Sequence, residues 1–409
     1  MKTFVITNNK GGTGKTTLSK LLAEASHYSA ENIFFYDFED KHLRALFDVA
    51  SLNALKALLD LEGIDSEEKN LIIFDEIQHL RDPSNLLKLL HDHFTNIKII
   101  ATGSSSLQIK SKFSDSLAGR KRVYRVEPLS FNEYLLFTEQ TKLLHLRKIF
   151  KEQEDRSTLI SLALSYKDDF LRVFEEYLLF GGYPEVVLLS SKEEKIRKLD
   201  SIASSYIQKD IREIANIDNI DAYNKLLKYL AINSGSQFNL SSVRETIGIS
   251  SVTLQKYLLL LQETFVVAEL APFFTNKNKE ISKLKKIFYK DTGVRNLQIA
   301  NFNAIELRTD NGALYENYIF NALEHNRNVL QQNYFYRTQS KSEIDFITSY
   351  EDQYTLIEVK SGYFSKTPKA MKEFEKKYDG QLTIKEKIVI NRSHLDLAGD
   401  IKFLPAYLF

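Results

Sequence analysis

A glycine-rich stretch near the start of the chain, NNKGGTGKTT, has the residue types that bind nucleotide phosphates. Gly11, Gly12 and Gly14 allow backbone N–H groups to curl around phosphate oxygens. Lys15 can reach the β- and γ-phosphates, and the Thr16 hydroxyl can coordinate Mg²⁺. The stretch therefore predicts ATP and Mg²⁺ as cofactors. The other residues expected in the phosphate cradle are Lys10, Thr13 and Thr17.

The residues around this stretch predict a strand, a loop and a helix. TFVIT (Thr3–Thr7) suits a short buried strand, and TTLSKLLAEA has the spacing of an amphipathic helix. The full phosphate-loop pattern is G-x-x-x-x-G-K-[ST], and Asn9 stands where its first glycine belongs. This departure leaves the affinity for nucleotide open. A glycine-rich turn without a ligand is the alternative, and the acids further along the chain disfavour it.

Those acids follow a second apolar run, NLIIFDEIQHL (Asn70–Leu80). Asp75 would join Thr16 in holding Mg²⁺, and Glu76 would polarise the water that attacks the γ-phosphate. A third apolar run, Ile97–Ser106, ends in small polar residues. We expect Thr102 or Ser104 there to sense the γ-phosphate, the alternative being a simple strand-to-loop turn.

A second constellation of acids lies near the end of the chain. Glu316 falls on a predicted helix, Gly312–His325, and is followed by Asp345, Glu358 and Lys360 on two predicted strands in hairpin relation. Residues two apart on a strand share a face, so Glu358 and Lys360 should point the same way. We predict that Glu316, Asp345 and Glu358 bind Mg²⁺ and that Lys360 acts beside the metal as a catalytic residue. A degenerate site that cuts nothing is the alternative.

Between the two constellations the chain has a helix–turn–helix pattern. It covers Asn239–Leu270, with Asn239 or Ser241 as the first cap and Gly248 at the turn. DNA is a predicted partner, with a second possibility that this module only packs against protein. The residues that would meet base edges are Ser251, Thr253, Gln255 and Lys256.

Beyond this pattern, Thr275–Arg295 holds seven Lys or Arg residues against two acids, enough for a phosphate-contacting wing. The residues before the pattern, from Leu135 to about Asn219, have helical spacing. That spacing is broken at FGGYPEVV, where Gly181 and Gly182 are expected to form a hinge or cap between helices.

Composition excludes several classes of protein. The chain has 43% hydrophobic and 27% charged residues, which is ordinary for a globular protein. It has no cysteine, so disulfides and thiolate metal sites are excluded, and its eight histidines show no metal-ligand spacing. No run approaches the roughly 18 apolar residues of a membrane helix, and the start lacks a signal-peptide pattern, so we expect a cytoplasmic protein without a membrane partner.

The order of these motifs resembles the predicted AAA+ ATPases of bacteria and archaea. The resemblance rests on FDEIQ, ATGSSSL, SLAGR (Ser116–Arg120) and EPLSFNEYL (Glu127–Leu135), together with Ile33–Phe47. It implies that Arg120 reaches a γ-phosphate in its own subunit or a neighbour's, with a solvated basic turn as the alternative. It also implies a winged helix and a C-terminal domain similar to restriction endonucleases.

KGGTGKTT by itself resembles a different family, the partition and septum-site ATPases, in which a lysine placed like Lys10 reaches across a dimer. Glu76 and the helix–turn–helix pattern count against that family. An oligomer formed through the ATPase domain is nevertheless possible.

At ~150 residues per domain, 409 residues predict two or three domains. The motifs divide the chain into an α/β P-loop ATPase domain with a parallel sheet (1–135), a helical lid or connector (136–219), a winged helix (220–300) and an α/β nuclease-like domain (301–409). The predicted function is ATP hydrolysis coupled to DNA binding, with metal-dependent DNA cleavage in question. The alternative is a nucleotide-dependent switch that binds DNA or a protein partner without cutting.

Overall fold

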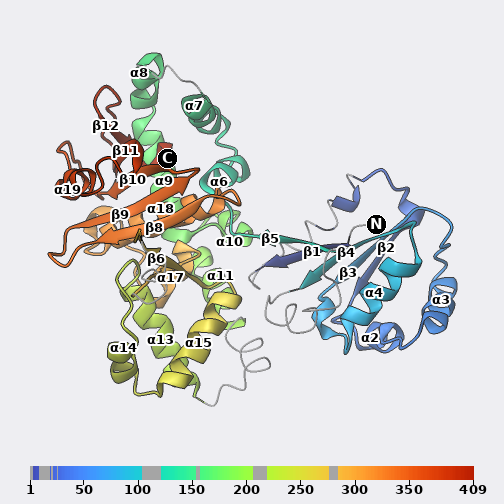
Figure 1. The fold of residues 1–409 in the computed structure, drawn as a ribbon. Coiled ribbons are helices and arrows are strands. Elements are labelled where there is room, and N and C mark those ends of the chain that lie inside the picture. Colours follow the sequence, from blue (N-terminus) through green and yellow to red (C-terminus); the bar gives the residue numbers. More distant parts are fainter. Residues whose placement is uncertain are drawn as a thin grey trace. The chain divides into compact units, whose positions relative to one another are not determined.

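The computed structural model describes residues 3–8, 19, 22–24, 26–103, 121–152, 157–205, 219–275 and 284–409 (Figure 1). The chain divides into two compact units. Unit 1 comprises Met1–Glu127, Ser204–Asn216 and Leu259–Phe265; unit 2 comprises Pro128–Ala203, Ile217–Leu258 and Val266–Phe409. The break at Glu127 lies close to the end predicted for the ATPase domain, at residue 135, and the other two predicted boundaries remain predictions.

Unit 1 is built on a five-stranded parallel sheet with the order β2-β3-β4-β1-β5 (Figure 1). Because all five strands run in one direction, their carboxyl ends meet at a single edge, which is where ligands bind in open α/β sheets. The strands are β1 (Thr3–Asn8), β2 (Ile33–Asp37), β3 (Asn70–Asp75), β4 (Ile97–Gly103) and β5 (Lys121–Val126). The predicted strands at the first, second and third apolar runs are therefore present.

Helices pack their apolar stripes against this sheet. In α3 (Leu52–Leu61), the side chain of Ser51 accepts a hydrogen bond from Ala54 N, and the buried residues recur at helical spacing. Every residue of β3 is buried, which explains its almost uninterrupted apolar sequence. Among the described residues, unit 1 also has the helices α2 (Lys41–Phe47) and α4 (Pro83–His93). It has two short 3₁₀ turns, η1 (Ala30–Asn32) and η2 (Ile77–His79).

Unit 2 begins with helices and ends in a mixed sheet. The helices before the helix–turn–helix segment are α6 (Phe131–Phe137), α7 (Thr141–Glu152), α8 (Ser157–Ser165), α9 (Lys167–Phe180), α10 (Pro184–Val187) and α11 (Lys192–Ser205). Those that follow are α13 (Ile220–Ile232), α14 (Leu240–Ile247), α15 (Ser251–Glu263), α17 (Thr292–Gln298), α18 (Asn311–His325) and α19 (Lys369–Lys377), with the 3₁₀ turns η4 (Ile305–Leu307) and η5 (Ala406–Leu408). The last two residues of α11, from Ser204, and the end of α15, from Leu259, belong to unit 1.

One seven-stranded sheet runs through unit 2 in the order β12-β11-β10-β9-β8-β6-β7. Its strands are β6 (Val267–Pro272), β7 (Lys286–Tyr289), β8 (Gln332–Arg337), β9 (Glu343–Tyr350), β10 (Gln353–Val359), β11 (Thr383–Asn391) and β12 (Ile401–Pro405). Strand β6 pairs antiparallel with β7 and parallel with β8. The hairpin expected as a wing is therefore continuous with the C-terminal sheet, across the boundary predicted at residues 300 and 301.

The FGGYP stretch joins α9 to α17 by close backbone approach. Gly181 is the C-cap of α9 and has a φ of 76°, which matches the cap predicted for it. Gly182 N donates to Asp291 Oδ2 at 2.8 Å. A Cβ on Gly182 would lie 2.3 Å from Leu129 O, so only glycine fits there. Asp291 also caps α17 by accepting from Val294 N, and one buried carboxylate thus ties two helices together.

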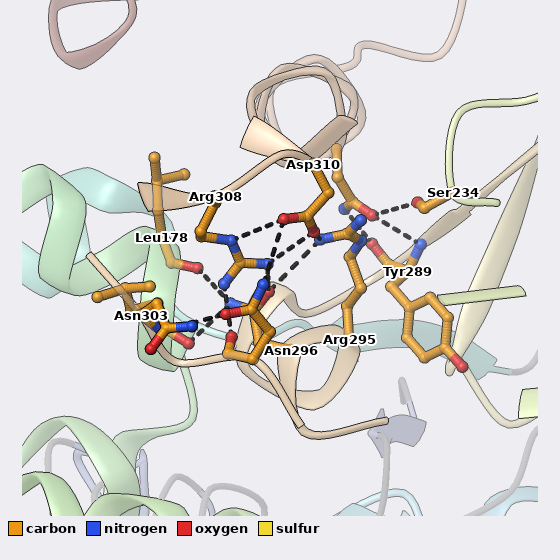
Figure 2. Close-up of polar contacts among 11 residues, drawn as sticks. Leu178, Ser234, Tyr289, Arg295, Asn296, Asn303, Arg308 and Asp310 are labelled. Atoms are coloured by element: carbon orange, nitrogen blue, oxygen red, sulfur yellow. Dashed lines mark hydrogen bonds and ion pairs between the residues drawn. The ribbon is translucent and has the colours of Figure 1, made fainter. Parts of the chain in front are cut away.

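A buried polar network holds the segment that leads into α18 (Figure 2). The Asp310 carboxylate lies between the guanidinium groups of Arg295 and Arg308, whose side chains are 0% exposed. The N–O distances to Asp310 Oδ2 are 2.8 Å from Arg295 Nη1 and 2.7 Å from Arg308 Nη2. Asn296 accepts from Arg308 Nη2 and donates to Leu178 O at the end of α9. This network secures α17 and α18 against α9. Across the described residues, none of the helices combines the length and apolar character needed to cross a membrane.

Candidate functional sites

The carboxyl edge of the unit 1 sheet brings together three of the predicted site residues. Asp75 ends β3, Glu76 follows it, and Thr102 lies near the end of the neighbouring strand β4. Their exposed fractions are only 4%, 8% and 0%. Strand β4 also pairs with β1, where Thr7 lies opposite Gly103, so these residues stand next to the strand that leads into the glycine-rich stretch.

Thr102 links the two acids of this edge. Its Oγ1 accepts from Glu76 N at 3.2 Å and donates to Asp75 Oδ1. A hydroxyl has one proton, and here that proton points to Asp75. Thr102 therefore fixes the ends of β3 and β4 in this structure, and a direct donation to a γ-phosphate would require it to release Asp75.

Glu76 has an unusual backbone. Its φ of 52° and ψ of 45° place it in the left-handed region, where a residue with a side chain is strained. Strain of this kind costs roughly 1–3 kcal/mol and gathers at functional sites. The turn directs Glu76 N at Thr102, while Glu76 Oε2 accepts from the side chain of Gln78. Thr102 thus holds the backbone of Glu76, and Gln78 holds the carboxylate that we predict to polarise water.

Several predicted residues lie outside the part of the chain that the structure describes. They are Ser104 and Arg120, together with the phosphate-cradle residues Lys10, Gly11, Gly12, Thr13, Gly14, Lys15, Thr16 and Thr17. Their roles stay predictions.

The second constellation gathers on α18 and the β9–β10 hairpin. Lys360 Nζ lies 2.6 Å from Glu358 Oε1, so these two side chains share a face as predicted. Val359 between them is buried in the main core. Asp345 Oδ2 accepts from Val359 N at 2.7 Å, which brings the third predicted residue to the same point. Glu358 Oε2 is buried and has no hydrogen-bond partner among the described residues.

Burial and mutual repulsion raise the pKa values of these acids. Burial raises the pKa of Glu316 to about 8, Asp345 adds to the effect, and Lys286 opposes it. Burial likewise raises the pKa of Glu358 to about 7, with Asp345 adding and Lys360 opposing. The pKa of Asp345 is also raised by burial, against the influence of Lys286. The four predicted residues therefore form one electrostatic cluster.

Three charged residues at this cluster were not predicted from the sequence: Lys286, Glu343 and Arg337. Lys286 at the start of β7 lies 2.5 Å from Glu343 Oε1 and 3.6 Å from Glu316 Oε2, measured from its Nζ. Arg337 pairs with the other oxygen of Glu343 at 3.1 Å. Lys286 stood in a basic run, which suggested phosphate contacts, and nothing in its local sequence separated it from its neighbours.

The contacts of Lys286 correct part of the expectation that Thr275–Arg295 contacts phosphate, whereas Lys277, Lys279 and Lys283 lie outside the described residues. Lys286 is 2% exposed and Arg295 is 0% exposed, and both are paired with acids. Lys285 lies 2.5 Å from Glu269 Oε2. The positive charge of these three residues is thus balanced within unit 2.

The acids do not converge on a metal-sized position. Among the residues that the structure describes, no group of three or more Asp, Glu, His or Cys side chains is arranged to hold a metal ion. Oxygen donors suit Mg²⁺, and the unpartnered oxygen of Glu358 would accept a cation. The ammonium group of Lys286, however, already lies among the acids. In this arrangement the cluster fits a lysine better than a metal ion.

The helix–turn–helix elements lie where the sequence predicts them. Asn239 caps α14 by accepting from Ser241 N and Ser242 N, and Gly248 ends that helix. Ser250 Oγ accepts from Thr253 N at the start of α15. The residues near this end that are exposed are Ser251, Val252, Gln255 and Lys256. They are available to a partner.

Three segments of the chain match known domain families. Residues 11–135 match the AAA domain, residues 171–305 match a domain of unknown function (DUF8612), and residues 311–409 match a second domain of unknown function (DUF4143). The first match, together with the parallel sheet of unit 1, supports a P-loop fold and nucleotide-binding ATPase activity for this part of the chain.

Relatives occur in archaea and bacteria. An uncharacterized protein of Methanocaldococcus jannaschii is 30% identical over 298 residues, which cover 70% of this chain and 60% of that protein. An uncharacterized protein of Haemophilus influenzae is 25% identical over 339 residues, covering 81% and 75% of the two chains. The match thus spans only 60% of the length of the M. jannaschii relative.

Two solved structures show weak similarity. The Aeropyrum pernix ORC1 protein in complex with DNA is 12% identical, with a TM-score of 0.30 over 73% of this chain and 87% of that one. The ADP form of the Aeropyrum pernix ORC2 protein is 13% identical, with a TM-score of 0.33 over 74% and 89%. Similarity at this level carries no argument about this chain.

Proposed function

We propose that the chain is an AAA-type ATPase that hydrolyses ATP at the carboxyl edge of the unit 1 sheet and uses unit 2 to bind DNA. The observation that carries this proposal is the buried group of Asp75, Glu76 and Thr102 on adjacent parallel strands. The AAA domain match over residues 11–135 supports it independently.

The residues of this edge have distinct roles in the proposal. ATP supplies the phosphoanhydride bond that is broken, and Mg²⁺ would be held by Asp75 and Thr16. Asp75 suits a hard cation because it offers carboxylate oxygen at the end of a buried strand. Glu76 accepts a proton from the attacking water, and Gln78 orients its carboxylate at the strained turn that follows β3. Thr102 positions both acids through its hydroxyl.

The remaining predicted residues complete the nucleotide site in this proposal. Lys10, Thr13, Thr17 and the glycines of the phosphate cradle surround the phosphates, with Lys15 at the β- and γ-phosphates. Arg120 stabilises negative charge on the γ-phosphate, in its own subunit or in a neighbour's.

DNA binding is proposed for the start of α15. A helix at this position of a helix–turn–helix enters the major groove with its first residues against base edges. Ser251, Gln255 and Lys256 are exposed there and can donate or accept hydrogen bonds. Nucleotide-dependent binding of DNA or of a protein, without cleavage, satisfies the same observations.

Cleavage of nucleic acid by the C-terminal cluster is a second candidate function. The observation that favours it is the shared face of Glu358 and Lys360, with Asp345 bonded to the residue between them. A lysine beside clustered carboxylates can stabilise charge on a phosphate.

The ATPase proposal is tested by measuring ATP binding and hydrolysis by the full chain and by Lys15→Ala. We expect the variant to lose hydrolysis and most of its nucleotide affinity, because an ammonium group in the phosphate cradle is gone. Lys56→Ala is the matched control, since Lys56 is exposed on α3. Wild-type binding and turnover in Lys15→Ala would show that the phosphate-loop assignment is wrong.

A further inference from the structure

The acidic cluster of unit 2 contains a lysine from outside the nuclease-like segment. Lys286 begins β7, the edge strand that pairs with β6 and is separated from β10 by β9, β8 and β6. Its side chain is 2% exposed, and its Nζ lies 2.5 Å from Glu343 and 3.6 Å from Glu316. Lysines are almost never buried to this degree unless they are paired. The position of this ammonium is therefore set by the acids around it.

The contacts of Lys286 favour an ammonium ion. Glu343 and Glu316 lie within ion-pair distance of its Nζ. The Phe335 ring lies beside the same ammonium group, with Nζ 5.3 Å from the ring centroid. Two acids and an aromatic ring thus contact this one buried lysine.

The turn between α13 and α14, just before the helix–turn–helix segment, approaches Glu316 as well. Gly235, between α13 and α14, has a φ of 81°, and its N donates to Ile287 O on β7 at 2.9 Å. A Cβ on Gly235 would lie 3.1 Å from Glu316 Oε2 and 3.2 Å from the Phe288 ring. Only glycine combines this backbone with so close an approach. Gly235 and Lys286 therefore both approach Glu316, and the hydrogen bond from Gly235 N to Ile287 O links the α13–α14 turn to β7.

We propose that Lys286 is the built-in cation of this cluster and competes with a divalent metal ion for Glu316, Asp345 and Glu358. An ammonium 3.6 Å from Glu316 repels a second cation and holds the acids in positions set by β7. Metal-dependent chemistry at the cluster is then suppressed while β7 keeps its place. The inference rests on the second candidate function, because it concerns the same acids, and it assigns that site its regulation.

The test is a titration of Mn²⁺ into the full chain without nucleotide. Calorimetry measures the heat of binding, and electron paramagnetic resonance measures the concentration of free Mn²⁺. We expect Lys286→Met to bind Mn²⁺ at least tenfold more tightly than wild type, because the competing charge is gone. Lys286→Arg keeps the charge and should behave like wild type. Lys285→Met is the matched control, since Lys285 is the neighbouring lysine and pairs with Glu269 instead.

Two double variants keep the test decisive. Lys286→Met with Glu358→Gln should lose the gained affinity, which assigns the bound ion to this cluster rather than to Asp75. If Lys286→Met does not fold, Lys286→Met with Glu316→Gln preserves the charge balance and should bind Mn²⁺ more tightly than Glu316→Gln alone. Equal or weaker Mn²⁺ binding after removal of Lys286 in a folded variant would overturn the inference.

This test is separate from the test of the proposed function. ATP hydrolysis by the same preparations reports on unit 1. If the chain hydrolyses ATP but removal of Lys286 does not change its Mn²⁺ affinity, only the competing-cation inference is refuted. If removal of Lys286 raises the Mn²⁺ affinity but the chain does not hydrolyse ATP, only the ATPase proposal is refuted. Nicking of supercoiled DNA by Lys286→Met, but not by wild type, would add support for cleavage as the suppressed activity.

Discussion

Asp310→Asn should strongly destabilise unit 2, because one carboxylate neutralises two fully buried guanidinium groups. Both Arg295 and Arg308 are 0% exposed and contact Asp310 Oδ2 within 2.8 Å, and Arg308 Nε also reaches Oδ1 at 2.9 Å. Removing one partner of a buried ion pair costs about 3–5 kcal/mol. Asparagine keeps the shape and one acceptor oxygen, so we expect about 3 kcal/mol, a large part of the roughly 5–15 kcal/mol that stabilises a domain.

The assay is guanidinium unfolding followed by far-ultraviolet circular dichroism, since the chain has no tryptophan. Hydrogen exchange measured by mass spectrometry should show faster exchange in α17, which assigns the loss to unit 2. The control is Asp379→Asn, because Asp379 is exposed in the turn after α19. Equal unfolding midpoints and equal exchange in the two variants would refute the reasoning.

This prediction has a pH dependence with a definite sign. Burial alone would raise the pKa of Asp310, but hydrogen bonds from Arg308 and the charge of Arg295 outweigh burial and lower it. A carboxyl group whose pKa is lowered by folding stabilises the folded chain above its unfolded pKa of about 3.9, and that stability is lost as the pH falls through the lower folded value. The difference between wild type and Asp310→Asn should therefore shrink only in strong acid.

Three further changes give separable outcomes. Gly182→Ala should lower the free energy of unfolding by at least about 1–3 kcal/mol, because its Cβ would lie 2.3 Å from Leu129 O; denaturant unfolding measures this, and an unchanged midpoint would contradict it. Burial raises the pKa of Asp291 to about 6, above its unfolded value of about 3.9, so wild-type stability should fall as the pH rises from about 4 to 6. Asp291→Asn should remove that fall, and an identical pH profile would refute the assignment. Lys256→Glu should weaken binding of a labelled DNA duplex and reduce the slope of its salt dependence by about 1. Lys228→Glu is the control and should change neither quantity, since Lys228 is exposed on α13. Fluorescence anisotropy measures both affinities, and equal affinities would show that α15 is not the DNA-binding surface.

Local patterns were sufficient to predict most of the elements. The apolar runs that end at Asp75 and Thr102 have the length and punctuation of buried parallel strands, and both form as expected. The alternation that placed Glu358 and Lys360 on one face follows from strand geometry alone. The cap at Gly181 likewise follows from a glycine at the end of a helical pattern.

Long-range pairings could not be predicted in this way. Nothing in the sequence near β6 states that it pairs with β8, so the hairpin was expected to belong to a separate winged helix. Lys286 was predicted to contact phosphate for the same reason, because its partners Glu316 and Glu343 lie far along the chain and its local sequence does not indicate them. The sequence of a basic run does not show which of its lysines and arginines are exposed and which are buried in ion pairs, because the pairing depends on tertiary structure.

The central claim, that the chain hydrolyses ATP with Glu76, is tested most directly by Glu76→Gln. Glutamine keeps the shape of the side chain but is a poor proton acceptor, so it should leave nucleotide binding intact and slow hydrolysis by roughly 10²–10⁴-fold. The measurement compares the binding of a fluorescent ATP analogue with single-turnover hydrolysis of ATP in wild type and in the variant. Full binding with lost hydrolysis is the predicted result, and hydrolysis at the wild-type rate by fully bound Glu76→Gln would contradict the account.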